Sequence, residues 1–197
     1  MSNRTRKALL SVLVIGIVGT VAGIGTYSAF SSTTSNDGNV FAAGTVYLSD
    51  NDSGGAMYNV SNKKPGDQVQ SCIQVTYGGS LAADVKLYTT SSIGTVGQYI
   101  DLTVEKGTAS GATFPGCGTY TSQSTVYSGT LSNFGSSKNS YANGVSAYPG
   151  SQTSWGTGDS LVYRFTLTLQ DNNSANGGGS GALSSGSHSF TWEARNQ

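Results

Sequence analysis

The nine residues Leu161-Val162-Tyr163-Arg164-Phe165-Thr166-Leu167-Thr168-Leu169 decide the fold, because a large apolar side chain occupies every second position. A period of two is that of a β-strand with one buried face and one exposed face. Burying a single Leu or Phe side chain contributes roughly 1.5–3 kcal/mol. The stretch therefore predicts a strand that anchors a sheet. The residues on its buried face are Leu161, Tyr163, Phe165, Leu167 and Leu169.

Shorter runs of the same kind occur along the chain, separated by clusters of Gly, Ser, Asn and Asp. They predict strands at Val40–Leu48, Ala56–Val60, Val69–Tyr77, Asp84–Tyr88, Tyr99–Lys106, Thr125–Leu131 and Ser187–Ala194. No segment after Ala29 has the period of an amphipathic helix. The predicted fold is an all-β antiparallel β-sandwich, jelly-roll-like, with about eight strands. It forms a single domain over residues 41–197.

Three polar, turn-rich segments interrupt this pattern. Gly107–Gly118 and Gly135–Gly158 are predicted to be loops, and so is Asn172–Gly186, which consists mostly of Gly, Ser and Asn.

The composition excludes several classes of protein. Only 10% of the 197 residues are charged and the formal net charge is zero, whereas an average chain has roughly 25% charged residues. Coiled coils and long charged helices are therefore excluded. A chain with no net charge has no field to attract nucleic acid, so we expect no nucleic-acid partner. Aromatic residues make up 10% of the chain, which argues against global disorder.

Residues 1–28 have the pattern of a cleaved secretory signal peptide. An apolar run, Ala8–Ile24, follows three basic residues, Arg4, Arg6 and Lys7. The run is shorter than the roughly 20 residues that span a bilayer, so we expect the segment to be cleaved and its contact with the membrane to be transient. Thr26 and Ser28 supply the small residues at the −3 and −1 positions, so we expect a signal peptidase to cut between Ser28 and Ala29. A retained anchor is the alternative. The exported part has seven basic against ten acidic residues, and we expect it at the cell surface or in the extracellular matrix.

Cys72 and Cys117 are the only two cysteines. Export places them in an oxidising compartment, where an even pair usually forms a disulfide. Cys72 alternates with apolar neighbours, so we expect it on the strand face opposite the core. A disulfide there would hold the Phe114–Cys117 loop over the sheet. Two free thiols are the alternative.

The sequence offers little to catalysis, and we expect neither catalytic residues nor a resident cofactor. A zinc-protease helix needs two histidines four residues apart, but His188 is the only histidine and is predicted to be a solvated strand residue. Asp50 and Asp52 before Gly54 match the start of a calcium loop, but position twelve is Ser61 rather than glutamate. A polar turn is the alternative. Asp171-Asn172-Asn173 is a second partial match.

Five segments resemble the TasA/camelysin family. Gly25–Phe30 resembles the signal-peptide junction that a SipW-type signal peptidase processes in this family. Asn39–Leu48 is similar to its first conserved block. Pro65–Asp67 together with Ile73–Val75 is similar to the second, and Phe190–Ala194 to the closing strand.

The resemblance implies a secreted structural subunit of biofilm-matrix fibres. In such fibres, the N-terminal segment of one subunit completes the sheet of the next, so the partner would be the protein itself as a homopolymer. Carried onto this sequence, the donor segment is residues 29–40, from Ala29 to Val40, with Phe30 as a side-chain anchor. The low charge of the chain suits close self-association.

Two alternatives remain. The same family includes camelysin, a metalloendopeptidase, but one histidine and two oxidisable cysteines do not make a usual zinc site. The chain is alternatively a monomeric cell-surface binding module with exposed aromatic residues. The available aromatic residues are Tyr120, Tyr127, Tyr141, Tyr148 and Trp155.

Overall fold

The computed structural model describes residues 43–111, 113–172, 174–175 and 184–197. These residues belong to one compact unit, Ala43–Gln197. The predicted signal peptide (residues 1–28) and donor segment (residues 29–40) lie outside the described residues. So does most of the predicted loop Asn172–Gly186.

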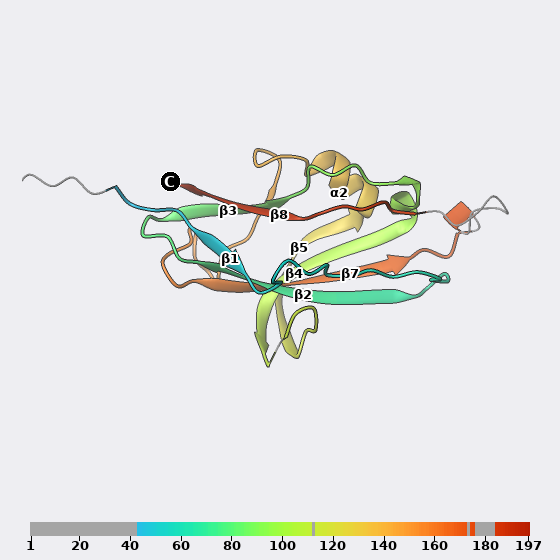
Figure 1. Cartoon of the computed structure of the whole chain (residues 1–197), viewed down its shortest axis with the longest axis horizontal. Helices are drawn as coiled ribbons and strands as arrows, with labels where there is room; N and C mark the ends of the chain where they lie inside the picture. The colour runs from blue at the N-terminus through green and yellow to red at the C-terminus, as the bar shows by residue number, and fades with distance from the viewer. Residues whose placement is uncertain (1–42, 112, 173, 176–183) are drawn as a thin grey trace, which may run out of the picture. The chain divides into compact units, whose positions relative to one another are not determined.

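Short strands make up most of the regular structure in the described part of the chain (Figure 1). In chain order the elements are β1 (Leu48–Asp50), β2 (Gln68–Tyr77), β3 (Ala83–Tyr88), the 3-10 helix η1 (Thr95–Tyr99), β4 (Ile100–Ser110), β5 (Thr119–Thr130), α2 (Leu131–Ser137), β6 (Val145–Ser146), β7 (Ser160–Leu169) and β8 (Thr191–Asn196).

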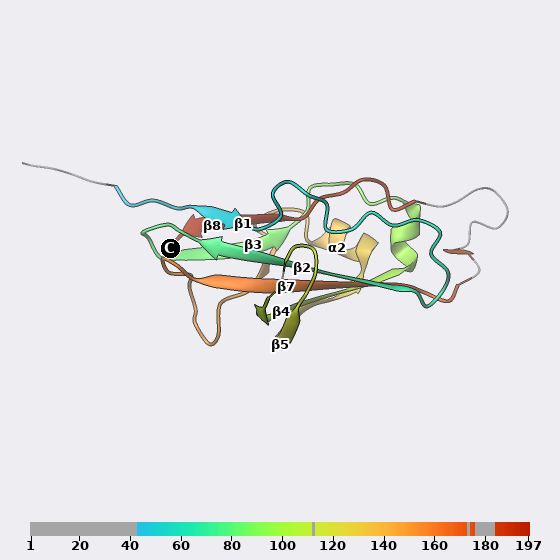
Figure 2. The ribbon, with the colours of Figure 1, turned by 60° about the horizontal axis from the view of Figure 1, so that its bottom comes forward.

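The strands form two antiparallel sheets. One has five strands in the order β1-β2-β7-β4-β5, and the other has three in the order β6-β3-β8. Figure 2 shows the two layers after a turn of 60°. The predicted all-β sandwich with eight strands is confirmed.

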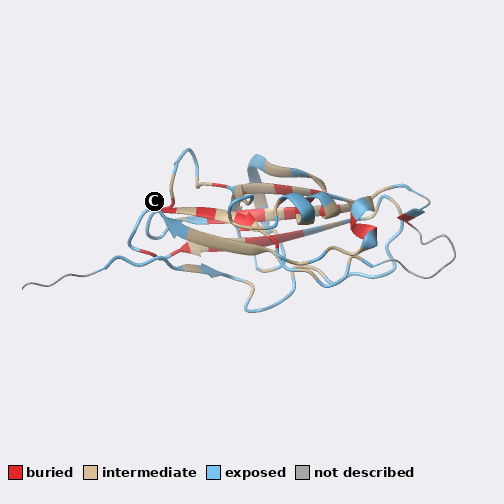
Figure 3. Ribbon diagram, turned by 90° about the horizontal axis from the view of Figure 1, so that it is seen from above, coloured by how far each residue is buried: buried red, intermediate tan, exposed pale blue. Residues whose placement is uncertain are grey.

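The core lies between the two sheets and centres on β7. Four side chains of its predicted buried face are at most 7% exposed: Leu161, Tyr163, Phe165 and Leu167. The ring of Phe165 contacts the facing sheet, with ring centroids 4.6 Å from Phe190 and 6.1 Å from Trp192. Buried residues concentrate along the middle strands in Figure 3. The period of two therefore places this strand and its buried face correctly.

Two predicted strands near the N-terminal side are wrong: one has other bounds and the other does not form. Val40–Leu48 was predicted as a strand, but β1 begins only at Leu48. The backbone before it bonds to a loop instead, since the Thr45 carbonyl accepts from the N–H of Ser80 at 2.9 Å. Ala56–Val60 forms no strand. Its Met57 carbonyl accepts from the Ser71 hydroxyl at 2.7 Å rather than from a neighbouring strand.

The predicted loops Gly107–Gly118 and Gly135–Gly158 contain regular structure that the prediction missed. The strands β4 and β5 extend into the loop Gly107–Gly118 and form a hairpin there. The helix α2, of about two turns, extends into the loop Gly135–Gly158. The Thr130 hydroxyl caps this helix by accepting from the Asn133 N–H at 3.1 Å. Leu131 and Phe134, three residues apart, bury one side of the helix.

Candidate functional site

Among the described residues, one side of the sandwich leaves a strand edge without a partner in each sheet. β1 ends the five-stranded sheet and β8 ends the three-stranded sheet, and the two strands contact each other. A groove of ≈ 280 Å³ lies between them. Its lining residues are Leu48, Ser49, Asp50, Asp52, Val75, Phe190, Thr191 and Trp192.

The groove exists because β1 is short. β1 pairs with only three residues of β2, Val75 to Tyr77, so core side chains come near the surface beside it. Leu48, Phe190 and Trp192 are partly buried side chains packed on the core. The groove thus joins an apolar floor to two unpaired strand edges, which is the arrangement that accepts an extended peptide segment.

Two buried polar atoms adjoin this floor without a hydrogen-bond partner among the described residues. They are the Trp192 Nε1 and the Tyr163 hydroxyl, on rings whose centroids are 5.4 Å apart. Burial raises the pKa of Tyr163 far above its usual range. Both polar atoms are enclosed by the protein, so they lie beneath the floor of the groove and are not exposed to an incoming segment.

The aspartates of the calcium-loop prediction lie in a polar turn beside the groove. An Asp50 carboxylate oxygen accepts from the Asp52 N–H at 3.1 Å, and an Asp52 oxygen accepts from the Gly54 N–H at 2.6 Å. Burial is the largest cause of the raised pKa of Asp50. Both carboxylates therefore accept backbone hydrogen bonds within the turn. The residues described include no group of three or more His, Cys, Asp or Glu side chains placed to hold a metal.

A disulfide joins Cys72 of β2 to Cys117, with their Cα atoms 4.9 Å apart. Cys72 is 2% exposed and lies on the face of β2 away from the core. Its N–H donates to the Pro115 carbonyl at 2.9 Å. The disulfide and this hydrogen bond hold the loop Phe114–Cys117 over the outer face of the sheet, as the position of Cys72 in its strand predicts.

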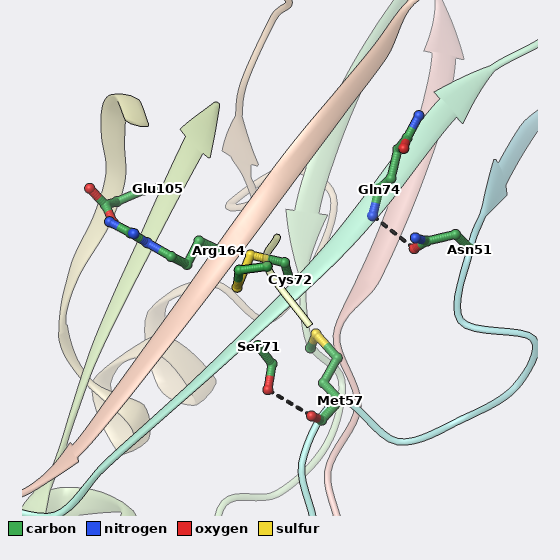
Figure 4. The surroundings of a disulfide bond; sticks show 8 residues. Asn51, Met57, Ser71, Cys72, Gln74, Glu105 and Arg164 are labelled. Carbon is green, nitrogen blue, oxygen red and sulfur yellow. Dashed lines mark hydrogen bonds and ion pairs between the residues drawn. A yellow bond between two sulfur atoms is a disulfide. The ribbon is translucent and has the colours of Figure 1, made fainter. Parts of the chain in front are cut away.

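An ion pair lies beside the disulfide on the same outer face (Figure 4). Arg164, which pairs in register with Cys72, donates from Nε to Glu105 at 2.9 Å. Its guanidinium stacks 4.4 Å from the Tyr120 ring centroid. Burial alone would raise the pKa of Glu105, but hydrogen bonds from Arg164 and Ser122 outweigh it and lower that pKa. Burial, then the Glu105 charge, raises the pKa of Tyr120 to about 12.

The lowered pKa of Glu105 makes stability depend on pH. A carboxylate whose pKa is lower in the folded state stabilises the fold above its ordinary pKa, here 4.5, and loses this effect as pH falls through the folded value. We expect Glu105→Gln to lower the free energy of unfolding by about 1 kcal/mol at neutral pH and by much less in acid. Urea denaturation across this range measures it, with the exposed Asp101→Asn as control. An equal loss at both pH values would contradict the expectation.

His188 is not the solvated strand residue that was predicted. It precedes β8, is half-buried, and uses both ring nitrogens. With its proton on Nδ1, the ring donates to the Gly186 carbonyl at 3.0 Å and accepts from the Tyr58 hydroxyl at 2.5 Å. Burial raises the pKa of Tyr58 far above its usual range. Neither His188 nor the disulfide-bonded cysteines are free to bind zinc in this arrangement, so the residues present do not fit a zinc site.

The aromatic residues considered for a binding surface do not form one exposed platform. Trp155 is 0% exposed and donates from Nε1 to the Ala147 carbonyl at 2.7 Å, so it is not available to a binding surface. Tyr141 and Tyr148 both donate to Asp84, at 3.0 Å to its carbonyl and 2.7 Å to its carboxylate. These contacts hold the loop before β7 against β3.

Of the groove residues, only Asp50 and Asp52 were among the predicted site residues, and they were predicted for a calcium loop rather than for strand binding. The alternation in Phe190–Ala194 signals a strand with a buried face, but it does not say that this strand ends a sheet next to β1. Pairing between residues far apart in the sequence decides that, and such pairing leaves no local pattern.

A family model described as camelysin metallo-endopeptidase matches residues 5–107, just over half of the chain. A search of curated proteins finds no match. In the part of the chain that the structure describes, no helix is long and apolar enough to cross a membrane.

Proposed function

Because this chain belongs to the camelysin metallo-endopeptidase family, the TasA/camelysin family, we propose that it is a secreted structural subunit of extracellular matrix fibres. Each subunit inserts its N-terminal segment into the next. A signal peptidase removes residues 1–28 during export, and residues 29–40 then act as the donor strand.

The observation that carries this proposal is the groove between β1 and β8. Both sheets end there in an edge that no other described strand pairs with, and the apolar floor includes Leu48, Val75 and Trp192. A donor of twelve residues in extended conformation reaches about 40 Å, which exceeds the length of the six-residue strand β8. The donor therefore has enough length to pair with the edge and to cross between subunits.

The chemistry of the donor suits this groove. Main-chain hydrogen bonds to the β8 edge supply affinity, and alternate side chains enter the groove. Phe30 is the one aromatic residue of the donor segment and is the anchor for the apolar floor. Most other residues of Ala29–Val40 are Ser, Thr, Asn or Asp, which pack poorly in a core but tolerate a partly exposed edge.

A structural role also agrees with the contacts of the histidine and cysteines, the residue types that most often bind zinc. The chain has one histidine and two cysteines, and all three are engaged in the contacts described above. The proposal therefore includes no peptidase activity. Casein cleavage that survives repurification and stops with a chelator would contradict this part of it.

Deleting Ala29–Asn39 from the exported protein is expected to abolish filaments seen by negative-stain electron microscopy, because no strand then fills the neighbour's groove. Phe30→Ala should reduce filament length and Phe30→Leu should largely restore it. The soluble peptide of residues 29–40 should bind the deletion variant and raise its thermal midpoint. Filaments unchanged by the deletion would refute the donor role, and monodisperse wild-type protein at high concentration would favour a monomeric binding module.

A further inference from the structure

The ends of β4 and β5 form a two-stranded arm outside the main sheet. β4 pairs with β7 only as far as Gly107, opposite Val162. Beyond it, Thr108–Ser110 pairs with β5 alone. We call Gly107–Ser110 together with Thr119–Ser124 the arm. Figures 1 and 2 show this hairpin end projecting from the five-stranded sheet.

The arm begins at a bend that requires glycine. Register shifts occur between Val104 and Glu105 and between Lys106 and Gly107, and such bulges bend and twist a strand pair. A Cβ atom on Gly107 would lie 2.2 Å from the Thr121 carbonyl oxygen, closer than two atoms can approach. The bend therefore directs the arm away from the neighbouring strand β7 and leaves both its edges without a partner strand in the described residues.

Covalent and ionic contacts hold the arm in this position. The disulfide fixes Cys117, two residues before the returning strand β5, to Cys72 of β2. Arg164 of β7 stacks on the Tyr120 ring at 4.4 Å, and the Ser122 hydroxyl donates to Glu105 at 2.8 Å. A free two-stranded ribbon is marginally stable in water, so these contacts give the arm a defined edge before any partner arrives, which reduces the entropic cost of binding.

The edge of the arm belongs to a longer and less charged strand than the other edges of this fold. Natural edge strands are short or carry charges. β6 has two residues, β1 has three including Asp50, and β8 carries Glu193 and Arg195. β5 is twelve residues long with no charge and no proline. In the arm, Thr119 and the four residues 121–124 are exposed.

We propose that the arm pairs edge to edge with the arm of a second copy of this chain, through Thr119–Ser124 of β5. Two copies of one strand pair antiparallel about a two-fold axis, and like charges would oppose this, but the arm has none. Six residues from each copy are far fewer than the roughly 20–30 residues a side of a stable complex. The interface is therefore a weak lateral contact that gains strength when many subunits are joined in a fibre. This contact is independent of the donor segment and lies beyond the region that the family model matches.

Sedimentation velocity of the exported protein, below the concentration at which filaments form, tests the proposal. Wild-type protein should show reversible dimers. The double variant Thr121→Lys with Gln123→Lys should self-associate about tenfold more weakly, because like charges then face each other. Thr121→Glu with Gln123→Glu should behave alike, and an equal mixture of the two variants should restore dimers. Asn59→Lys with Ser61→Lys, at two exposed loop positions, is the matched control with unchanged association.

Two results would overturn the proposal. One is wild-type protein that stays monomeric throughout, and the other is a lysine variant that dimerises like the control while circular dichroism shows both folded.

The deletion of Ala29–Asn39 separates this contact from the proposed fibre mechanism. If the donor role fails, filaments persist in the deletion variant, but the charge dependence of the dimer is unaffected. If the arm contact fails, filaments still depend on the donor segment.

Discussion

Replacing both Cys72 and Cys117 by alanine is expected to lower the free energy of unfolding by about 4 kcal/mol. The disulfide closes a loop between residues 45 apart in the sequence, and in the chain-entropy model it removes that much loop freedom from the unfolded chain. Typical domains have only about 5–15 kcal/mol of net stability. Urea denaturation of the oxidised wild type and the double variant measures the difference.

Reduction of the wild-type protein provides the control for this prediction. A thiol reductant should shift the wild-type midpoint towards that of the double variant and leave the variant itself unchanged. Because Cys72 is 2% exposed, reduction should be slow in the folded state and faster in denaturant. Equal midpoints for the oxidised wild type and the variant would show that the loop Phe114–Cys117 is held by its other contacts.

Phe165→Ala is expected to cost about 3–5 kcal/mol, the range for removing a large aromatic side chain from a packed core. Phe165 is 0% exposed and its ring contacts those of Phe190 and Trp192 across the sandwich. The substitution removes these contacts and leaves a cavity between the two sheets. Thermal or urea unfolding followed by circular dichroism measures the loss.

The next residue of the same strand supplies a matched control. Thr166 lies on the outer face of β7 and is partly exposed. Thr166→Ala should change the free energy of unfolding by less than about 1 kcal/mol. Similar losses for the two variants would mean that β7 has its faces reversed.

Alternation predicted the strands that have one buried and one exposed face. β2, β3 and β7 were placed to within a residue or two, since their apolar side chains recur at every second position. The hairpin end at Gly107–Ser110 was missed because its Thr, Ala and Ser side chains bury no continuous face. α2 was missed because it has only seven residues, including Gly135, too few to show a helical period.

The features around the candidate site differ in how far local sequence predicts them. The disulfide follows from export and an even number of cysteines, and the outward face of Cys72 follows from its neighbours. The groove depends on which strands end the sheets. Leu48 and Trp192 are 144 positions apart in the numbering, and only the order of strands in both sheets brings them to the same opening. Trp155 was one of the aromatic residues available for a binding surface, but its side chain enters the core.

The positions of the two tryptophans give the protein an intrinsic fluorescence probe. Trp155 is enclosed in the core and Trp192 lines the groove, and the chain has no other tryptophan. A Trp155→Phe variant therefore emits from the groove alone, without an attached dye. Its emission spectrum follows the polarity around Trp192 in real time. The entry of a strand at this opening can thus be timed by stopped flow separately from the later growth of a fibre.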